Sequence, residues 1–179
     1  DLSKVREAVK QGLGLLGGAA QFVQPGENIL IKPNLLTGVS PDQCVSPHPM
    51  VFQAVLEEFK ASGAKLSFGD SPGYGSTQAA ALGAELLPIA EALEVPIADF
   101  RNGEIVSFHE GNLIKQFTFA KVVLESDGLI SLSKMKAHAL TRITGAIKNQ
   151  FGCIPGVLKA EFHSKLPSAN MFSKMLVDL

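Results

Sequence analysis

The chain has 179 residues, a formal net charge of −1 and 46% hydrophobic residues, so it suits a globular domain with a sizeable core and excludes a disordered segment. It contains no tryptophan and one tyrosine, which leaves little aromatic surface for stacking on nucleic-acid bases. Cys44 and Cys153 are too few for a disulfide framework and fit a reducing compartment, so we expect a cytoplasmic protein. No apolar run approaches the length of a membrane span, so we expect no membrane partner.

Helical periodicity appears first at the start of the chain. Apolar residues recur every three or four positions from Leu2 to Leu16, with Ser3 placed as an N-cap and Gly17-Gly18 as the end. Similar spacing predicts later helices over 47–62, through Ala81, and over 86–93, 141–150 and 169–176.

Short apolar runs between these helices predict strands at 27–32, 65–69, 97–100, 104–108 and 128–132, and a strand followed by a helical turn within 117–126. This alternation favours a parallel sheet. We therefore expect a single α/β domain, residues 1–179, with a doubly wound, mostly parallel, Rossmann-like sheet and helices on both faces. The sequence begins without methionine and stops directly after an apolar run, so we expect a fragment of a longer protein.

Charged or glycine-rich segments follow three of the predicted strands. Ligands bind at the carboxyl ends of the strands in an open parallel sheet, so these segments should meet at one edge. The candidate ligand-binding residues after the first two strands are Lys32, Asn34, Gly69, Ser71, Gly73, Ser76 and Thr77. Candidates in and after the third loop are Lys134, Lys148 and Asn149.

Positive charge is concentrated in the C-terminal part of the chain. Residues 134–165 carry six Lys/Arg and one Glu, whereas residues 1–133 carry nine Lys/Arg and fifteen Asp/Glu. Such a field attracts an anion. A solvated basic surface, with Lys148 on the outside of its helix, is the plainer alternative.

Catalytic roles are predicted for His138, Lys136 and Asp70. Lys134, Lys136 and His138 alternate, so in an extended chain they point the same way, and their mutual repulsion lowers the pKa of a lysine or the histidine. Asp70 could orient His138, bind a metal or act as a base. In the alternative interpretation the lysines are solvent-exposed and His138 is a hydrogen-bonded loop residue.

The loop GDSPGYGST (69–77) contains the parts of an anion cradle, because glycines allow close backbone approach and Ser76 or Thr77 precedes a helix N-terminus. It lacks the Gly-Lys-Ser/Thr ending of a Walker loop, and the chain lacks GxGxxG. An ordinary strand-to-helix turn explains the loop equally well.

No metal ligands are predicted. Cys44, His48, Cys153 and His163 offer four donor side chains, but no CxxC or HxxxH pair gives a zinc spacing. Two cysteines cannot supply the four ligands of an iron–sulfur cluster.

Five motifs carry a resemblance to a known family: ILIKPNLL (29–36), VSPHP (45–49), GDSPG (69–73), LISLSKMKAH (129–138) and TGAIKNQFGC (144–153). Together they resemble the domain of unknown function 362 family. The resemblance implies an iron–sulfur association, because many members carry a ferredoxin-like domain with two 4Fe-4S cysteine sets after this region. Those sets are absent here, so no cofactor is expected within this chain and clusters are expected only in a further domain of the parent protein.

The family typically has Lys-Thr-His where this chain has Lys136-Ala137-His138, which removes a hydroxyl. More distantly, the fold is similar to the N-terminal part of nickel-pincer lactate racemases, an analogy of fold alone.

The preferred hypothesis is a redox-associated domain that binds an anionic small molecule or cofactor, with a ferredoxin-like domain as a partner. The alternative is a non-catalytic scaffold that docks an electron-transfer module through basic residues that include Lys159 and Lys165. Nucleic-acid binding uses the same charge but has no motif, so no nucleic-acid partner is expected.

Overall fold

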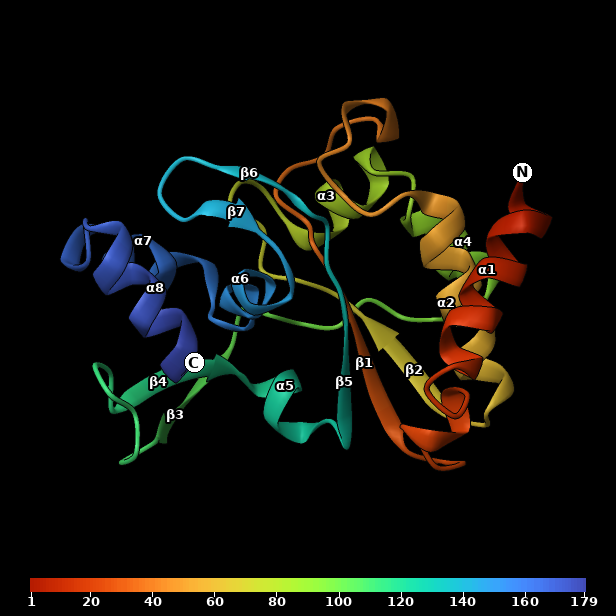
Figure 1. Cartoon of the computed structure of the whole chain (residues 1–179), viewed down its shortest axis with the longest axis horizontal. Helices are drawn as coiled ribbons and strands as arrows, with labels where there is room; N and C mark the ends of the chain where they lie inside the picture. Colours follow the sequence, from red (N-terminus) through yellow and green to blue (C-terminus); the bar gives the residue numbers. More distant parts are fainter.

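The structure is a computed structural model that describes the backbone of residues 1–179 and every side chain except that of Val157. Its central sheet has three parallel strands in the order β2-β1-β5 (Figure 1). These strands are β1 (Asn28–Pro33), β2 (Lys65–Phe68) and β5 (Gly128–Leu132). Two antiparallel pairs lie outside this sheet: β3 (Gly103–Ser107) with β4 (Gln116–Ala120), and β6 (Lys136–His138) with β7 (Arg142–Thr144).

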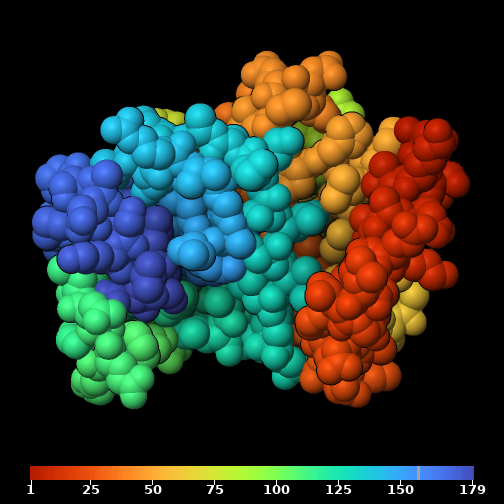
Figure 2. Space-filling view, viewed as in Figure 1, coloured from red at the N-terminus to blue at the C-terminus, as the bar shows by residue number. Residues whose placement is uncertain are grey.

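Helices lie on both sides of the central sheet. Figure 1 shows α1, α2 and α4 on one side, and α5 to α8 on the other. The helices are α1 (Leu2–Gly14), α2 (Pro49–Ala61), α3 (Thr77–Gly83), α4 (Leu87–Ala92), α5 (Lys121–Glu125), α6 (Ala146–Gln150), α7 (Gly156–Lys165) and α8 (Ala169–Asp178). In the space-filling view, β5 (teal) is visible between the N-terminal residues (red) and the C-terminal residues (blue) (Figure 2).

The α/β class predicted from the sequence is therefore confirmed. The doubly wound sheet is a finer prediction that these pairings do not confirm. Three of the described strands form the parallel sheet, and the other four pair antiparallel in two small separate sheets. The predicted strand at 97–100 contributes only an isolated bridge between Phe68 and Ile97.

Alternation along β1 sends its side chains into two different layers. Ile29 and Ile31 pack in the core formed with α1 to α4, whereas Leu30 packs in a cluster with Phe100 and Ala120. Lys32 has the parity of Leu30, so it faces the C-terminal layer and is fully buried there, with 0% exposure. The strand that builds the core therefore also directs a lysine into the interior.

The segment after β5 differs most from the sequence prediction. The helix expected over 141–150 begins only at Ala146, because Arg142–Thr144 pairs with Lys136–His138 as a hairpin. Arg142 has φ of 66° and cannot continue a right-handed helix. Helix α7 was not predicted at all; its residues lack a regular apolar stripe. At the other end of the chain the N-cap of α1 is Asp1, whose carboxylate accepts from Ser3 N at 3.0 Å, and not Ser3 itself.

Candidate functional site

A pocket of 370 Å³ lies at the carboxyl ends of β1 and β2, between the loops that leave them and the helices α6 and α7. We call it the strand-end pocket. Its lining residues are Asn34, Leu35, Leu36, Asp70, Ser71, Gly73, Tyr74, His138, Lys148, Asn149, Phe151, Gly152, Gly156, Lys159, Ala160 and His163. Segments that are far apart in sequence thus meet at one edge of the sheet, where open α/β proteins bind their ligands.

A buried ion pair forms the floor of this pocket. Lys32 Nζ lies 2.7 Å from Asp70 Oδ1, with side-chain exposures of 0% and 3%. Asn149 completes the arrangement, because its Oδ1 accepts from Lys32 Nζ at 3.2 Å and its Nδ2 donates to Lys32 O at 3.1 Å. The same Nδ2 lies 3.0 Å from Ser131 Oγ, so Asn149 ties α6 to both β1 and β5.

Asp70 also organises the two loops above the floor. Its Oδ2 accepts from the Leu35 amide at 2.8 Å, and its Oδ1 accepts from the Ser71 amide at 2.9 Å. No hydrogen bond joins Asp70 to His138 in the described part of the chain. The carboxylate is thus occupied by structural contacts and does not orient the histidine.

Gly152 is needed for the ion pair to fit. A Cβ at this position would lie 1.9 Å from Asp70 Oδ1 and 2.6 Å from Lys32 Nζ, both well inside van der Waals contact. Its carbonyl accepts from the Ser71 amide at 3.2 Å. The backbone at Gly152 therefore packs directly against the charged floor.

Two lysines give the pocket an excess of positive charge. Burial lowers the pKa of Lys148 to about 8, with Lys32 and Lys136 lowering it further and Asp70 opposing them. Burial likewise lowers the pKa of Lys159 to about 8. Asp70 is the only carboxylate among the lining residues that the structure describes, and it is already paired with Lys32. Both ammonium groups are still mostly charged at pH 7.

The two ammonium groups are held differently. Lys159 Nζ donates to the carbonyls of Ser71 and Pro72, so it is tied to the loop after β2. Lys148 Nζ lies 5.1 Å from the centroid of the Phe151 ring and has no salt-bridge partner among the described side chains. Lys148 is thus the cation with the greatest capacity for a ligand.

Two imidazoles line the same pocket. His138 Nδ1 accepts from the backbone amides of Leu140 and Thr141, both at 3.2 Å. His163 stacks on Phe172, with ring centroids 4.6 Å apart and an interplanar angle of 17°. Burial is the largest cause that lowers the pKa of each histidine, and the nearby lysines add to it.

The structure brings many of the sequence-predicted residues into this pocket. The predicted residues that line it are Asn34, Asp70, Ser71, Gly73, His138, Lys148 and Asn149. Lys32 lies directly beneath the pocket, paired with Asp70. Lys136 instead donates to the carbonyl of Val45, although its charge still acts on His138 and Lys148. Gly69, Ser76, Thr77 and Lys134 are not among the lining residues.

The glycine loop uses several of its polar groups in internal hydrogen bonds. The amides of Gly73 and Tyr74 both donate to Leu36 O, at 3.1 and 3.3 Å. Ser76 Oγ accepts from the Ala79 amide as the cap of α3, and Thr77 Oγ1 donates to Asp70 O at 2.8 Å. The part of the predicted anion cradle at Gly73 and Tyr74 is therefore an internally bonded turn.

Lys159 and His163 were not predicted as residues of this site. Both lie on α7, four positions apart, which places them on one face of that helix. The i, i+4 spacing after Pro155-Gly156 was the available signal. This spacing could not show that the face carrying both residues would be turned toward the pocket.

The cysteines are not close to forming a metal centre. Cys44 is exposed, and burial raises the pKa of the Cys153 thiol to about 11, so that thiol stays protonated. No group of three or more His, Cys, Asp or Glu side chains within the described part of the chain could hold a metal ion. None of the described helices has the length and apolar character needed to cross a bilayer.

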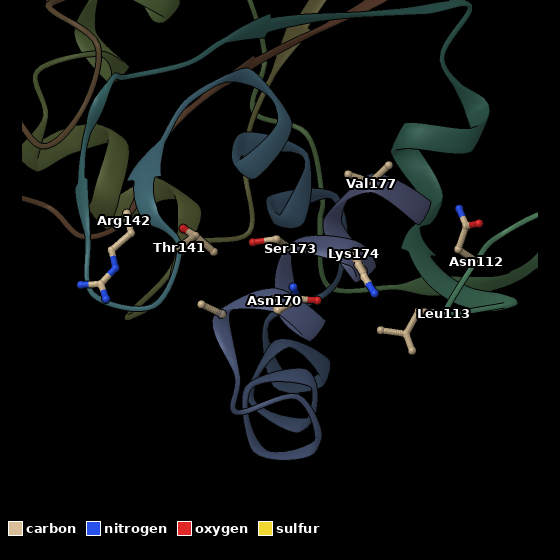
Figure 3. Close-up of a pocket in the computed structure, with 9 residues that line it drawn as sticks. Asn112, Leu113, Thr141, Arg142, Asn170, Ser173, Lys174 and Val177 are labelled. Carbon is tan, nitrogen blue, oxygen red and sulfur yellow. The ribbon is translucent and has the colours of Figure 1, made fainter.

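A larger cavity, of 860 Å³, lies elsewhere, between the β6-β7 hairpin and α8. Figure 3 shows Ser173, Asn170 and Lys174 of α8 between the hairpin residue Arg142 and the loop residue Asn112. This cavity has two cations and no carboxylate among its described lining residues, but none of its charged side chains is buried. The strand-end pocket, with its buried charges, is the better candidate for chemistry.

Fold and site together define an α/β protein with a basic pocket at the ends of its parallel strands. Residues 29–179 match the model of a family described as a domain of unknown function (DUF362), so the chain belongs to that family. It is 38% identical over 164 residues to the thylakoid-associated protein sll1697 of Synechocystis sp. (strain ATCC 27184 / PCC 6803 / Kazusa). That alignment covers 91% of the chain and 50% of the relative, so the chain spans about half the relative's length. No solved structure matches the chain at a significant level.

Proposed function

We propose that the strand-end pocket binds a small anionic molecule or cofactor. The observation that carries this proposal is Lys148, a partly buried ammonium group in the pocket without a carboxylate partner among the described residues. A desolvated cation without a counter-ion is unfavourable, and an anionic ligand would relieve that cost. Lys159 adds a second positive charge to the same lining.

Binding of anions tests this function directly. Calorimetry and thermal unfolding with phosphate, citrate and a nucleoside monophosphate should show binding and stabilisation by at least one of them. Lys148→Met should weaken that binding about tenfold, the loss of one charge-assisted contact. Lys10→Met, at an exposed position of α1, is the matched control and should bind like the wild type.

Two results would count against the function. One is the absence of stabilisation by every anion tested. The other is a Lys148→Met variant that binds as tightly as the wild type, because the unpaired ammonium would then have no role.

We further propose that the parent protein is redox-associated and carries iron–sulfur clusters in another domain. The support is the family resemblance and the small number of cysteines here, two in 179 residues. Visible absorption and electron paramagnetic resonance spectra of the purified parent protein test it. Spectra without cluster signals after anaerobic purification would refute this proposal and leave the anion site untouched.

A scaffold that docks an acidic ferredoxin-like domain is the second candidate. The observation that favours it is the cavity in Figure 3, where Arg142 and Lys174 are exposed and have no salt-bridge partner among the described side chains. Of the lysines suggested by the sequence, Lys159 lines the pocket and Lys165 pairs with Glu161. Docking should weaken with salt and in Arg142→Gln/Lys174→Gln. Unchanged affinity in the double variant would exclude this surface.

The doubly wound sheet and the cytoplasmic location are also proposals. A doubly wound sheet would arise if a further strand paired with β5, which pairs only with β1 among the described residues. The Leu129 amide faces the free edge of β5, because the register with β1 directs the amides of Ile130 and Leu132 toward β1. Slow amide exchange at Leu129 in a longer homologue, but not in this chain, would support that pairing. The cytoplasmic location is supported by two free thiols. Because the Synechocystis relative is named thylakoid-associated, cell fractionation that finds the parent protein in the membrane fraction alone would overturn it.

A further inference from the structure

The two imidazoles of the strand-end pocket have different hydrogen-bonding states. His138 Nδ1 accepts from two backbone amides, so this nitrogen carries a lone pair and no proton. In the neutral ring the proton must then sit on Nε2. His138 therefore presents an N–H donor to the pocket, and its only lone pair is already used.

The charge state of His138 reinforces this assignment. Burial lowers its pKa, and so do Lys148 on α6, His163 on α7 and Lys136 on β6. No carboxylate is among the groups that shift it. The ring thus stays neutral at physiological pH, with Nδ1 as acceptor and Nε2 as donor. A permanent donor is a different role from the catalytic one that the sequence predicts for His138.

His163, unlike His138, has a ring nitrogen that can accept a hydrogen bond from a ligand. His163 is exposed at the pocket rim, and its ring contacts Phe172, on which it stacks, and Phe151, which meets it edge-on at 5.5 Å and 88°. Neither of its ring nitrogens has a hydrogen-bond partner among the described residues. Burial, Lys148 and Lys159 all lower its pKa, so it is neutral and keeps one unused lone pair. The two aromatic contacts orient one side of its ring.

We propose that these imidazoles divide recognition of one ligand: His138 donates through Nε2 to an anionic oxygen, and His163 accepts from a hydroxyl or amino group of the same molecule. This rests on the proposed anion site. The ligand class it defines is a carboxylate or phosphate with a neighbouring hydroxyl or amino group. Lys148, whose charge acts on both imidazoles, binds the anionic end.

A matched pair of ligands tests the division. Glycerol 3-phosphate and n-propyl phosphate have the same phosphate and chain length, and only the first has hydroxyl groups. Calorimetry on the 179-residue chain at pH 7.5 should show glycerol 3-phosphate binding two- to tenfold more tightly, the value of about one neutral hydrogen bond.

His163→Phe keeps the aromatic stack and removes the lone pair. It should bring the affinity ratio of the two ligands to about one while leaving propyl phosphate affinity within about twofold of the wild type. His109→Phe, at an exposed loop position, is the control and should keep the preference. An equal affinity for both ligands in the wild type, or a preference that survives His163→Phe, overturns the division. Failure of both ligands to bind instead contradicts the anion site itself.

Nuclear magnetic resonance of the ring nitrogens gives a test that needs no variant. Correlations from the carbon-bound ring protons of His138 should show an unprotonated Nδ1 and a protonated Nε2 between about pH 7.5 and 8.5. Adding glycerol 3-phosphate should shift the Nε2–H signal and leave the tautomer unchanged. A His138 ring with the proton on Nδ1, or one that titrates near pH 7, would overturn its role as a permanent donor.

Discussion

At the scale of single residues, the charged floor of the pocket depends on steric fit as much as on attraction. Lys32 and Asp70 are both almost fully buried, and such a pair is tolerated because hydrogen bonds occupy the atoms that are left over. The neighbour that makes room is Gly152. Substitutions at Gly152 and at Lys32 should therefore both disturb the same floor, one by steric overlap and the other by loss of charge.

Gly152→Ala should destabilise the protein by about 1–3 kcal/mol, because the new methyl group would overlap Asp70 Oδ1 and must displace the ion pair or the backbone. The midpoint and slope of urea unfolding measure this. Gly12→Ala is the control: Gly12 lies in α1, where a methyl group would meet no neighbouring atom within 4 Å, so the change should be neutral or stabilising. Equal stability of Gly152→Ala and the wild type would show that the pocket floor is not tightly packed.

Lys32→Met should cost about 3–5 kcal/mol, because it leaves the Asp70 carboxylate buried without its cation. The double variant Lys32→Met/Asp70→Asn should cost less than the sum of the two single changes, a coupling that a double-mutant cycle measures. At the exposed pair of Arg6 and Glu57, Arg6→Met should cost at most about 1 kcal/mol. Additive effects at Lys32 and Asp70 would contradict the interpretation of the floor as one unit.

At the scale of elements, α8 is fixed to the loop before β4 by a single carboxylate. Asp178 accepts from the backbone amides of Asn112, Leu113 and Ile114, at 2.7, 2.6 and 2.9 Å. These bonds lower the pKa of Asp178 from 3.8 to about 2, with the Ile114 amide as the largest cause. The end of α8 thus binds the loop through its carboxylate, in addition to the apolar packing of Leu113 and Ile114 in the cluster that contains Leu176.

The stability that Asp178 contributes should depend on pH in a defined window. Because its folded pKa is depressed, the contribution is present above pH 3.8 and is lost as pH falls toward about 2. Asp178→Asn should therefore lower the urea midpoint at pH 7, and its difference from the wild type should shrink between pH 4 and 2. Asp42→Asn, at an exposed position, should follow the wild type at each pH. A constant difference for Asp178→Asn across this range would contradict the prediction.

The elements predicted correctly are those whose pattern is local. The apolar spacing of α1 and α2 and the short runs of β1, β2 and β5 carry their own signal. The β6-β7 hairpin was missed because its strands have three residues each, alternate few apolar side chains and turn through Arg142 at positive φ. For α7, the choice of the face that meets the pocket is made by tertiary packing, which spacing alone does not encode.

The residues of the candidate site also fall into two groups: those that local sequence predicts and those that depend on tertiary packing. His138 could be proposed from sequence because it lies in the loop after a predicted strand, and Lys148 and Asn149 because they lie in the predicted helix that follows that loop. Lys32 was placed at the right strand end, but its burial and its pairing with Asp70 depend on which face of β1 meets the C-terminal layer. Lys159 and His163 lie on α7, which follows α6 and a short 3-10 helix, so their position beside the pocket depends on how these elements pack.

At the scale of the whole molecule, the strand-end pocket lies where two layers of different charge meet. The N-terminal layer supplies Asp70, the only carboxylate among the described lining residues, and the C-terminal segment supplies Lys148, Lys159 and both imidazoles. Burial is the main cause that lowers the pKa of both lysines, and repulsion by neighbouring lysines adds to it. Binding of an anion in the pocket is thus linked to protonation of Lys148 and Lys159.

This linkage predicts how anion affinity depends on pH. Sulfate is a suitable probe because its own charge is constant over the range. Its affinity should be nearly flat below about pH 7 and should fall above pH 8, where Lys148 and Lys159 lose their protons, by up to about tenfold per pH unit for each ammonium required. Calorimetry between pH 6.5 and 9.5 measures it. Lys148→Arg keeps its charge throughout and should make the decline shallower, whereas an identical decline in that variant would assign the proton to another group.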